Sequence, residues 1–282
     1  MNGLLSQVTS PSIWGKPFLR WAGSKRKLLA TLLHEVPPQS TRYIEPFAGS
    51  ACLFFALRPV SAILGDINEQ LVEAYRVVRQ HPRKVARAVA QWKNTKHEYY
   101  RLRRLCPGDL ELIDRAARFI YLNRYCFNGV YRTNRLGNFN VPRGSRTGRV
   151  PDEQTFYRCA IALRDAELRA GDFEECLRNV GPGDFVYLDP PYAQSSRPTH
   201  GEYGYDGFGK SDIDRLVACL KRIDRAGGVF LLSYCDTPAL DARLSRKWAV
   251  RKISVRRHIA GFAKHRMCVG EVLVSNKTLC PS

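Results

Sequence analysis

The hydrophobic positions of this chain form short apolar runs that alternate with helical patterns near its N-terminus. Strands are predicted over residues 43–47 and 62–64, the second leading to Asp66, and helices over Cys52–Leu57 and residues 69–79. This order of strand, small-residue turn, helix and strand is typical of the opening of a nucleotide-binding α/β domain.

The alternation then stops between residues 81 and 165, where the chain is polar, rich in Arg and mostly helical in pattern. Within this stretch, residues 121–144 combine Gly, Asn and aromatic residues, a composition that suits a loop or a β-hairpin. We therefore predict a helical insert over residues 81–165.

Strand patterns return at Glu167 and are strongest over residues 185–188, 229–233 and 269–275. Because strands on both sides of the insert suit one parallel sheet, we predict a single catalytic α/β domain. Its expected boundaries are residues 1–80 and 166–282, with a loose leader over residues 1–16.

The charge of the chain indicates a polyanionic partner. Lys and Arg number 45 against 26 Asp and Glu, which gives a formal net charge of +19, and the Arg residues are spread along the chain. Such an excess on a folded domain favours nucleic acid, although a basic, well-solvated surface is the simpler alternative.

The nine Cys residues are scattered without a Cys-x-x-Cys pair, so neither a disulfide framework nor a zinc site is expected, and no metal site is predicted. Reduced thiols of this kind suit a cytoplasmic protein. The N-terminus lacks the pattern of a signal peptide, and no apolar stretch approaches the length of a membrane span, so no membrane association is expected.

The strongest chemical signal is Asp189-Pro190-Pro191-Tyr192, which follows the predicted strand at residues 185–188. Two prolines end a strand because they lack N–H donors and fix φ. Asp189 and Tyr192 should therefore project at the carboxyl edge of the sheet, where open α/β folds bind ligands. A carboxylate and a backbone carbonyl there would accept both N–H bonds of an aromatic amine, while Tyr192 would stack on a base taken out of a duplex. The alternative is a Pro-Pro strand end with an incidental Asp.

Three weaker signals precede that turn. Gly49, in Glu-Pro-Phe-Ala-Gly-Ser after a strand, lets the backbone approach a ligand closely. Asp66 lies 17 residues later, close to the spacing at which an acidic residue binds ribose hydroxyls, although it could instead cap a helix. Trp21 offers a stacking face and Lys25 a cation for a carboxylate, although a lone Trp is usually core packing.

Together these motifs resemble those of the Dam-type, D12-class DNA adenine methyltransferases. The likeness runs from about Phe18 to Asn276 and keeps the family's order of Arg-Trp-Ala-Gly-Ser-Lys, Glu-Pro-Phe-Ala-Gly-Ser, Gly-Asp-Ile-Asn, Gly-Asp-Phe and Asp-Pro-Pro-Tyr. The resemblance implies a Rossmann-like α/β fold with a seven-stranded, mostly parallel sheet that binds S-adenosyl-L-methionine (AdoMet). It also implies that the helical insert recognises the DNA target.

The resemblance assigns two groups of site residues. Those implied for catalysis are Asp189, Pro190, Pro191 and Tyr192. Those implied for cofactor binding are Trp21, Lys25, Phe47, Asp66, Asp172, Phe173 and Asp189. In the second group, Lys25 would lie near the AdoMet carboxylate and Asp66 would hold the ribose. Asp172 and Phe173 would hold the adenine moiety.

The insert carries the expected DNA contacts, which by the resemblance are Phe127, Asn128, Arg132, Arg135 and Asn138. Asn128-Gly129 is a strong turn signal, so a hairpin is predicted with aromatic and cationic residues around its tip. Phe127 is expected to wedge into the base stack, and Arg132 to read guanine O6 and N7. The alternative is that Phe127 and Tyr131 pack the hairpin onto the insert and the Arg residues touch only phosphate.

Two positions depart from the family pattern, because Ser24 and Ala51 stand where it usually has Gly. Both replacements are small, so we expect a weaker or shifted cofactor fit rather than its loss. The polar, Gly-rich stretch 193–209 is expected to form a loop that closes over the flipped base.

The reaction predicted from these features is AdoMet-dependent methylation of the adenine N6 amino group at specific sites in double-stranded DNA, without a metal or a covalent intermediate. The open alternatives are methylation of RNA or of cytosine amino groups, and an inactive homologue that only binds DNA. No obligate protein partner is expected, and a cognate restriction endonuclease is the one candidate.

Overall fold

The computed structural model describes residues 15–145, 147–192, 208–253 and 270–279. Most of the expected leader, up to residue 14, and most of the loop expected to close over the base, residues 193–207, lie outside the described part of the chain.

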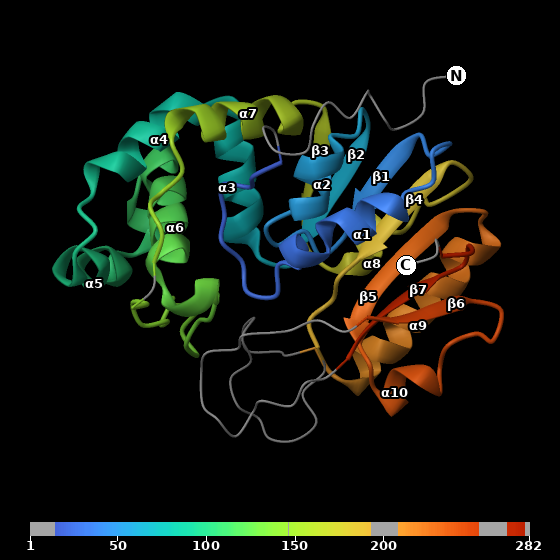
Figure 1. The fold of residues 1–282 in the computed structure, drawn as a ribbon. Coiled ribbons are helices and arrows are strands. Elements are labelled where there is room, and N and C mark those ends of the chain that lie inside the picture. Colours follow the sequence, from blue (N-terminus) through green and yellow to red (C-terminus); the bar gives the residue numbers. More distant parts are fainter. Residues whose placement is uncertain (1–14, 146, 193–207, 254–269, 280–282) are drawn as a thin grey trace.

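A seven-stranded sheet with the strand order β3-β2-β1-β4-β5-β7-β6 forms the centre of the fold (Figure 1). β1 to β5 run parallel to one another, while β7 is antiparallel to both β5 and β6. The predicted seven-stranded, mostly parallel sheet is therefore confirmed. The strands are β1 (Arg42–Glu45), β2 (Ala62–Asp66), β3 (Ala166–Ala170), β4 (Asp184–Leu188), β5 (Val229–Cys235), β6 (Ala249–Ile253) and β7 (Glu271–Ser275).

The helices fall into a set that covers the sheet and a group that stands to one side of it, with α3 between that group and the strands (Figure 1). Around the sheet lie the 3-10 helix η1 (Lys25–Leu28), α1 (Leu29–His34), α2 (Cys52–Leu57), α3 (Glu69–Gln80), α8 (Phe173–Cys176), α9 (Lys210–Arg225) and α10 (Pro238–Asp241). The insert holds α4 (Pro82–Gln91), α5 (Lys96–Arg104), η2 (Pro107–Asp109), α6 (Leu112–Tyr125), η3 (Phe127–Gly129) and α7 (Glu153–Leu163).

The side chains of the strands alternate between two apolar cores. In β4, Phe185 and Tyr187 belong to the core shared with α2, α3 and the insert, whereas Val186 and Leu188 belong to the core shared with α8 and α9. Because both faces are covered, every residue of β4 is buried, which explains its continuous apolar run in the sequence.

The first core continues without a break into the insert. Ile120 of α6 and Phe156 of α7 belong to the same buried cluster as Phe18 and Tyr75. Phe18 packs against Phe156 and Tyr75, with ring centroids 5.5 and 5.3 Å apart. The insert is thus fixed to the sheet part by shared apolar packing, and its treatment as a separate domain stays a prediction.

A buried amide adds a polar link at the same junction. Asn123 on α6 donates from Nδ2 to the carbonyl of Arg20 (2.6 Å) and accepts from the Arg20 backbone N–H (2.9 Å). Nearby, the N–H of Ala22 donates to the carbonyl of Gly129 (3.1 Å). The segment that carries Trp21 and Lys25 is therefore held against the insert by backbone hydrogen bonds.

The expected hairpin was placed too early in the chain. Residues 121–125 are the last turn of α6, because their apolar side chains pack in the core and the helix ends only at Cys126. Asn128 and Gly129 do form a turn with positive φ (52° and 68°), but it lies in η3. The hairpin itself turns at residues 134–138, where the N–H groups of Leu136 and Asn138 both donate to Asn134 Oδ1.

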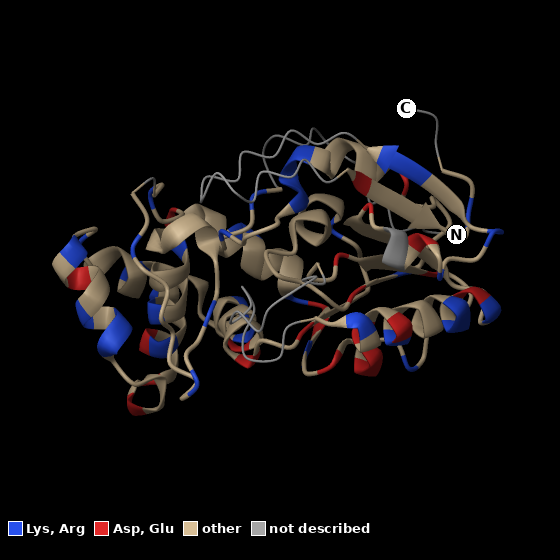
Figure 2. Cartoon of the chain, turned by 90° about the horizontal axis from the view of Figure 1, so that it is seen from below, with Lys and Arg blue, Asp and Glu red and all other residues tan. Residues whose placement is uncertain are grey.

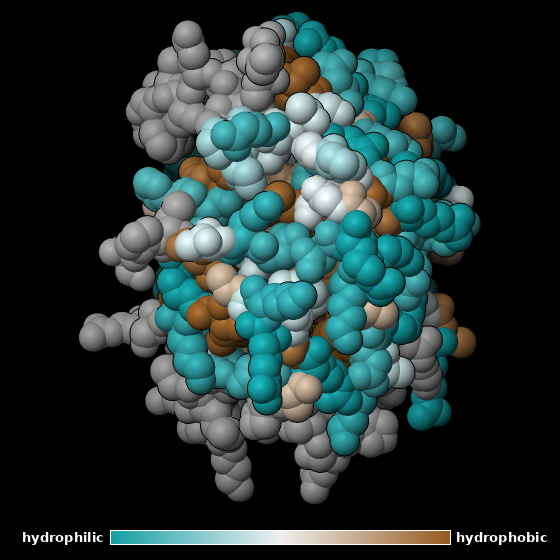
Figure 3. All heavy atoms as spheres, turned by 90° about the vertical axis from the view of Figure 1, so that its right-hand side faces the viewer, coloured by the Kyte–Doolittle hydropathy of each residue, from teal (hydrophilic) through white to brown (hydrophobic). Residues whose placement is uncertain are grey.

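Strand β6 at the sheet edge was not predicted, because only alternate residues of it are partly buried and Arg251 and Lys252 interrupt its apolar pattern. Charged side chains on an edge strand discourage pairing with a second sheet. Figure 3, which views the end of the molecule at the right of Figure 1, shows mainly hydrophilic side chains with hydrophobic ones in small groups.

Within the described ranges, none of the helices combines the length and the apolar character that crossing a bilayer would need. The same residues contain no grouping of three or more His, Cys, Asp or Glu side chains that could bind a metal ion.

Candidate active site

The sequence motifs meet at one edge of the sheet. The glycine turn follows β1, Asp66 ends β2, and Asp189 follows β4, which are three neighbouring parallel strands. β1 pairs with β2 on one side and with β4 on the other, so this edge is the point at which the strand order reverses. Open α/β folds bind their ligands at such a point.

Asp189 lies in a crowded polar environment directly after β4. Its Oδ1 forms an ion pair with Lys25 Nζ and accepts from Ser233 Oγ at 3.2 Å, and Ser233 is itself 3.1 Å from the hydroxyl of Tyr187. Burial raises the pKa of Asp189, and Lys25 partly offsets that rise. Within the described residues its Oδ2 accepts no hydrogen bond, which leaves one oxygen for a substrate.

Lys25 holds two carboxylates. Only 5% of its surface is exposed, and its Nζ contacts Asp189 and, at 3.2 Å, Oε1 of the buried Glu271 on β7. Burial disfavours the charge on Lys25, but Asp189, Tyr192 and Glu271 outweigh it and raise the pKa of Lys25 well above its ordinary value. The Lys25 ammonium, which was predicted to lie near the AdoMet carboxylate, therefore forms ion pairs with two protein carboxylates in this structure.

No role was predicted for Glu271, although it begins β7 and its carboxylate is buried there among apolar residues. An isolated buried acid in a strand was the available signal, because such a residue needs a partner. It also accepts from the hydroxyl of Tyr192 at 3.3 Å.

Tyr192 is half-buried, with its ring edge-on to Tyr234 at 5.4 Å and an interplanar angle of 83°. The Lys25 ammonium lies 5.5 Å from the centroid of its ring. Contacts at the hydroxyl and at the ring thus hold Tyr192 beside Asp189, while Pro190 is buried and Pro191 is partly exposed between them.

Trp21 packs tightly on the glycine turn. Gly49 has φ +47°, and a Cβ there would come within 2.7 Å of the indole Cδ1, so only Gly fits. On its other side the indole stacks on Tyr131, with centroids 6.1 Å apart and an angle of 16°. Trp21 therefore connects the turn after β1 to the insert.

The two departures from the family pattern differ in their backbone. Ser24 has φ −49°, which any residue adopts, so Gly is not required there. Ala51 has φ 49° and ψ 42°, a left-handed conformation that costs an L residue roughly 1–2 kcal/mol. The turn thus keeps its shape at Ala51 at an energetic cost.

Asp66 organises the turns around it. Its Oδ2 accepts from the N–H of Gly49 and its Oδ1 from the N–H of Asn68, both at 2.9 Å. The helix cap of α3 is Asn68, whose Oδ1 accepts from Leu71, so the capping alternative for Asp66 is wrong. Burial raises the pKa of Asp66 to about 6, against the lowering effect of the two backbone bonds.

Three aromatic rings lie beside Asp66 and the start of α8. Phe47 stacks on Phe173 with centroids 5.2 Å apart, and Phe208 lies within 6.4 Å of both. Asp172 caps α8 through the N–H of Glu174 at 2.9 Å.

Ile67 follows Asp66 directly, and no role was predicted for it. Its side chain is 72% exposed at the ligand edge, which is unusual for a large apolar residue in a loop between a strand and a helix. This exposure makes Ile67 a candidate site residue, and the sequence does not reveal it.

The predicted DNA contacts of the insert lie apart from Asp189 in sequence, two of them in η3 and three on the hairpin. Phe127 is 39% exposed, Asn128 follows it in η3, and Arg135 and Asn138 are exposed at the hairpin turn. Arg132 lies on the hairpin arm, where its Nε donates to Asn140 Oδ1 at 2.8 Å.

The neighbouring Tyr131 is packed rather than free. Its ring contacts Trp21, Phe119 and Phe139, and burial raises its pKa to about 12. The packing alternative therefore holds for Tyr131, whereas the DNA-contact role of the more exposed Phe127 stays a prediction.

A basic pocket of about 460 Å³ opens beside Trp21 and was not predicted. Arg20, Arg26 and Arg124 line it together with Ser24 and, among others, residues 147–148. Arg124 Nε is buried and has no hydrogen-bond partner among the residues that the structure describes. Burial, and then the nearby Arg20 and Arg26, lower the pKa of Arg124.

Several known proteins are similar to this chain over most of its length. The type II methyltransferase M1.LlaDCHI of Lactococcus lactis subsp. cremoris is 32% identical over 272 residues, which cover 93% of this chain and 95% of that protein. The type II methyltransferase M.MjaIII of Methanocaldococcus jannaschii is 30% identical over 267 residues, covering 86% and 92%. The DNA adenine methylase of Haemophilus influenzae is 28% identical over 278 residues, covering 95% and 96%.

The fold is that of a Rossmann-like methyltransferase, and the candidate site lies at the carboxyl ends of β1, β2 and β4. The family of D12 class N6 adenine-specific DNA methyltransferases matches residues 21–259, and the chain belongs to that family. The resemblance drawn from the sequence motifs is confirmed.

The ion cluster of Lys25, Asp189 and Glu271 makes a stability prediction. Lys25→Met should lower the free energy of unfolding by about 3–5 kcal/mol at neutral pH, because it removes the ammonium that contacts both the partly buried Asp189 and the buried Glu271. Since Lys25 lowers the pKa of Asp189, the variant takes up a proton there at higher pH. The loss should therefore shrink as the pH is lowered, as urea unfolding of both proteins across a pH series would measure.

The control for this prediction is Lys252→Met, which removes an exposed ammonium paired with Asp236. Its unfolding free energy should scarcely change. A Lys25→Met loss that is small, or that stays constant with pH, would contradict the assignment of the cluster.

Proposed function

We propose that this protein transfers the methyl group of AdoMet to N6 of adenine at specific sites in double-stranded DNA. The observation that carries the proposal is the Asp189 carboxylate, which an ammonium holds by one oxygen at the carboxyl end of β4, beside Tyr192. Membership of the D12 class supports adenine as the acceptor and DNA as the substrate.

Asp189 would act on the acceptor amine. Lys25 and Ser233 hold its Oδ1, so Oδ2 can accept one N–H of the adenine amino group, while the carbonyl of Pro190 accepts the other. These bonds localise the nitrogen lone pair and stabilise the positive charge that develops on N6. Tyr192 would stack on the adenine once it has left the duplex.

AdoMet, when bound, supplies an electrophilic methyl group, and the ligand edge fits such a cofactor. Asp66 would accept from the ribose hydroxyls, and the exposed Ile67 would cover the adenine moiety. On the other side, Phe173 and Phe47 offer ring surface and Asp172 an acceptor for the adenine amino group. Trp21 supports the glycine turn and, by its contacts, Lys25 orients Asp189.

The insert would hold and read the DNA. The Arg132 guanidinium is oriented by Asn140 through Nε, which leaves two terminal nitrogens for guanine O6 and N7. The exposed Phe127 ring suits a wedge into the base stack. Figure 2 shows Lys and Arg on the helical group and the strand part alike, which suits contacts to a long polyanion.

The basic pocket suits a DNA phosphate. A phosphate oxygen would give Arg124 Nε an acceptor, which it does not have within the described part of the chain, and would offset the repulsion among three neighbouring guanidinium groups. The type II names of two relatives also fit a partner restriction endonuclease, which stays a prediction for this chain.

The test of the proposal is the product formed with labelled AdoMet on duplex DNA, RNA and cytosine-containing duplexes that lack adenine. N6-methyladenine in duplex DNA is expected, and Asp189→Asn should abolish it because the amide cannot carry the stabilising charge. Unfolding should remain cooperative in this variant. Label in RNA or cytosine would favour those alternatives, and DNA binding without any turnover would indicate an inactive homologue.

The raised pKa of Asp66 predicts that the affinity for AdoMet depends on pH. Only the ionised carboxylate accepts from both ribose hydroxyls, so AdoMet should bind more weakly as the pH falls through about 6. Asp66→Asn should lose about 1.5–3 kcal/mol of affinity for each charge-assisted bond and should show no such inflection. Calorimetric titrations of both proteins across the pH range would decide this, and parallel pH curves would contradict it.

We expect Arg132 to set the base preference at one position of the DNA site. Arg132→Ala should relax preference at one base position by about 1–3 kcal/mol, seen in competition between single-base variants of the site at fixed salt. The control is Arg104→Ala on α5, which removes an exposed cation. This variant should bind all DNA sequences more weakly by the same factor, and its binding should depend less on salt. If Arg132→Ala lowers every rate by one factor, Arg132 positions the DNA and does not read it.

A further inference from the structure

We propose that Arg215 on α9 is a positioning residue that sets the specificity of the cofactor site for adenine. The proposal rests on the function above, in which Asp172 and Phe173 hold the adenine moiety of AdoMet. It adds a residue that touches neither cofactor nor DNA and acts through these two side chains.

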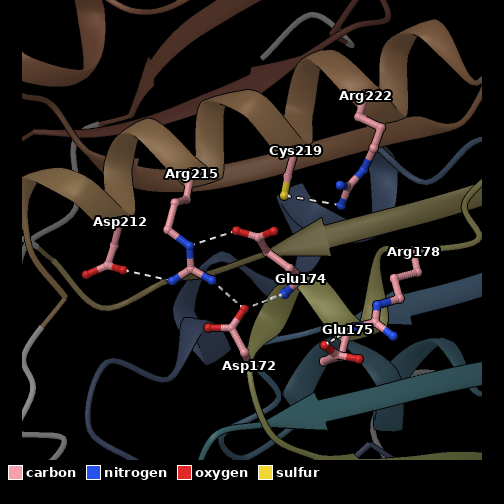
Figure 4. Close-up of polar contacts among 8 residues, drawn as sticks. All are labelled: Asp172, Glu174, Glu175, Arg178, Asp212, Arg215, Cys219 and Arg222. Atoms are coloured by element: carbon pink, nitrogen blue, oxygen red, sulfur yellow. Dashed lines mark hydrogen bonds and ion pairs between the residues drawn. The ribbon is translucent and has the colours of Figure 1, made fainter.

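Arg215 joins three acidic side chains from two elements (Figure 4). Its Nη2 donates to Asp172 Oδ1 at 2.7 Å, its Nε to Glu174 Oε1 at 2.7 Å, and its Nη1 to Asp212 Oδ1 at 3.1 Å. Asp172 and Glu174 stand at the start of α8, whereas Asp212 closes the first turn of α9 through the N–H of Gly209. One guanidinium thus fixes the start of α8 against the start of α9.

The contact orients the carboxylate of Asp172. Its Oδ1 accepts from both Arg215 and the N–H of Glu174, while Oδ2 accepts no hydrogen bond within the described residues. With Oδ1 occupied twice, the carboxylate cannot rotate without losing two hydrogen bonds. Oδ2 is therefore presented in one direction, as an acceptor that favours an amino group over a carbonyl.

The same guanidinium also fixes the ring of Phe173. Its central carbon lies 4.8 Å from the centroid of that ring, which in turn stacks on Phe47 at 5.2 Å. Cation–π and ring–ring contacts together leave Phe173 one orientation. Both adenine-contacting groups thus depend on one cation.

A merely structural role is the competing explanation. The side chain of Arg215 is 41% exposed and its partners are 26–37% exposed, so these ion pairs are screened by water and add little to folding. Their three-way geometry instead restricts motion at the ligand edge, where a small displacement weakens binding. The effect of removing Arg215 should accordingly fall on cofactor affinity and selectivity rather than on stability.

Two neighbouring arginines serve as matched controls (Figure 4). Arg222 lies two turns along α9 and contacts Cys219 Sγ at 3.5 Å, and Arg178 pairs with Glu175 at the end of α8. Their replacement by Gln removes the same charge near the same site without touching Asp172 or Phe173, which separates positioning from the local field.

The experiment compares Arg215→Gln, Arg178→Gln and Arg222→Gln by calorimetric titration with AdoMet and with its inosine analogue, in which a carbonyl replaces the adenine amino group. Arg215→Gln should bind AdoMet about 10-fold more weakly, the loss of roughly one charge-assisted hydrogen bond, and should discriminate less against the analogue. The two controls should stay within about twofold of the wild type. At saturating AdoMet, kcat should be kept and the KM for AdoMet should rise.

Several outcomes would overturn the proposal. They are an AdoMet affinity of Arg215→Gln equal to that of the controls, an equal loss for AdoMet and analogue, and a fall in melting temperature that Arg215→Lys rescues without restoring discrimination. Failure of the underlying site assignment is recognised separately, because Asp172→Asn would then leave discrimination between AdoMet and the analogue unchanged.

Discussion

The ion cluster of Lys25, Asp189 and Glu271 is the interaction on which the rest of the site depends. It joins the segment before α1, the end of β4 and the start of β7, three parts of the chain that no local structure brings together. Buried carboxylates are costly without a cation, so the cluster fixes the position of Lys25 and, with it, the turn that carries Trp21. The carboxylate of Asp189 is oriented as a consequence, because Lys25 and Ser233 both contact its Oδ1.

Local pattern in the sequence predicted the central strands and the sheet edge where the motifs meet, whereas the seven-stranded sheet followed from the resemblance to the family and β6 was missed. The strand runs, the Pro-Pro stop after Asp189 and the spacing from Gly49 to Asp66 are each written within a few residues. The partners were not predictable in this way. Glu271 as the second acid on Lys25, Asn68 as the true cap and the pocket around Arg124 arise from contacts between distant segments.

The hairpin was predicted in the wrong place, although the turn signal on which the prediction rested was correct. Asn128-Gly129 does adopt positive φ, as the dipeptide indicates, yet it lies in η3 because α6 extends to Tyr125. Packing of Tyr121 and Tyr125 in the core carries the helix further than the loop-like composition suggests. Tertiary burial thus overrode composition, and the hairpin moved to residues 134–138.

The same ion cluster has a consequence for synthesis on the ribosome. Lys25 emerges before Asp189, and Asp189 before Glu271, so the acid pair that holds the ammonium is complete only after Glu271 has been made. The insert, to which the Lys25 segment is bound through Asn123, is made in between. A nascent chain can therefore bury much of its core before the ion cluster at the candidate site is complete. The cluster forms only once β7, which carries Glu271, has been made.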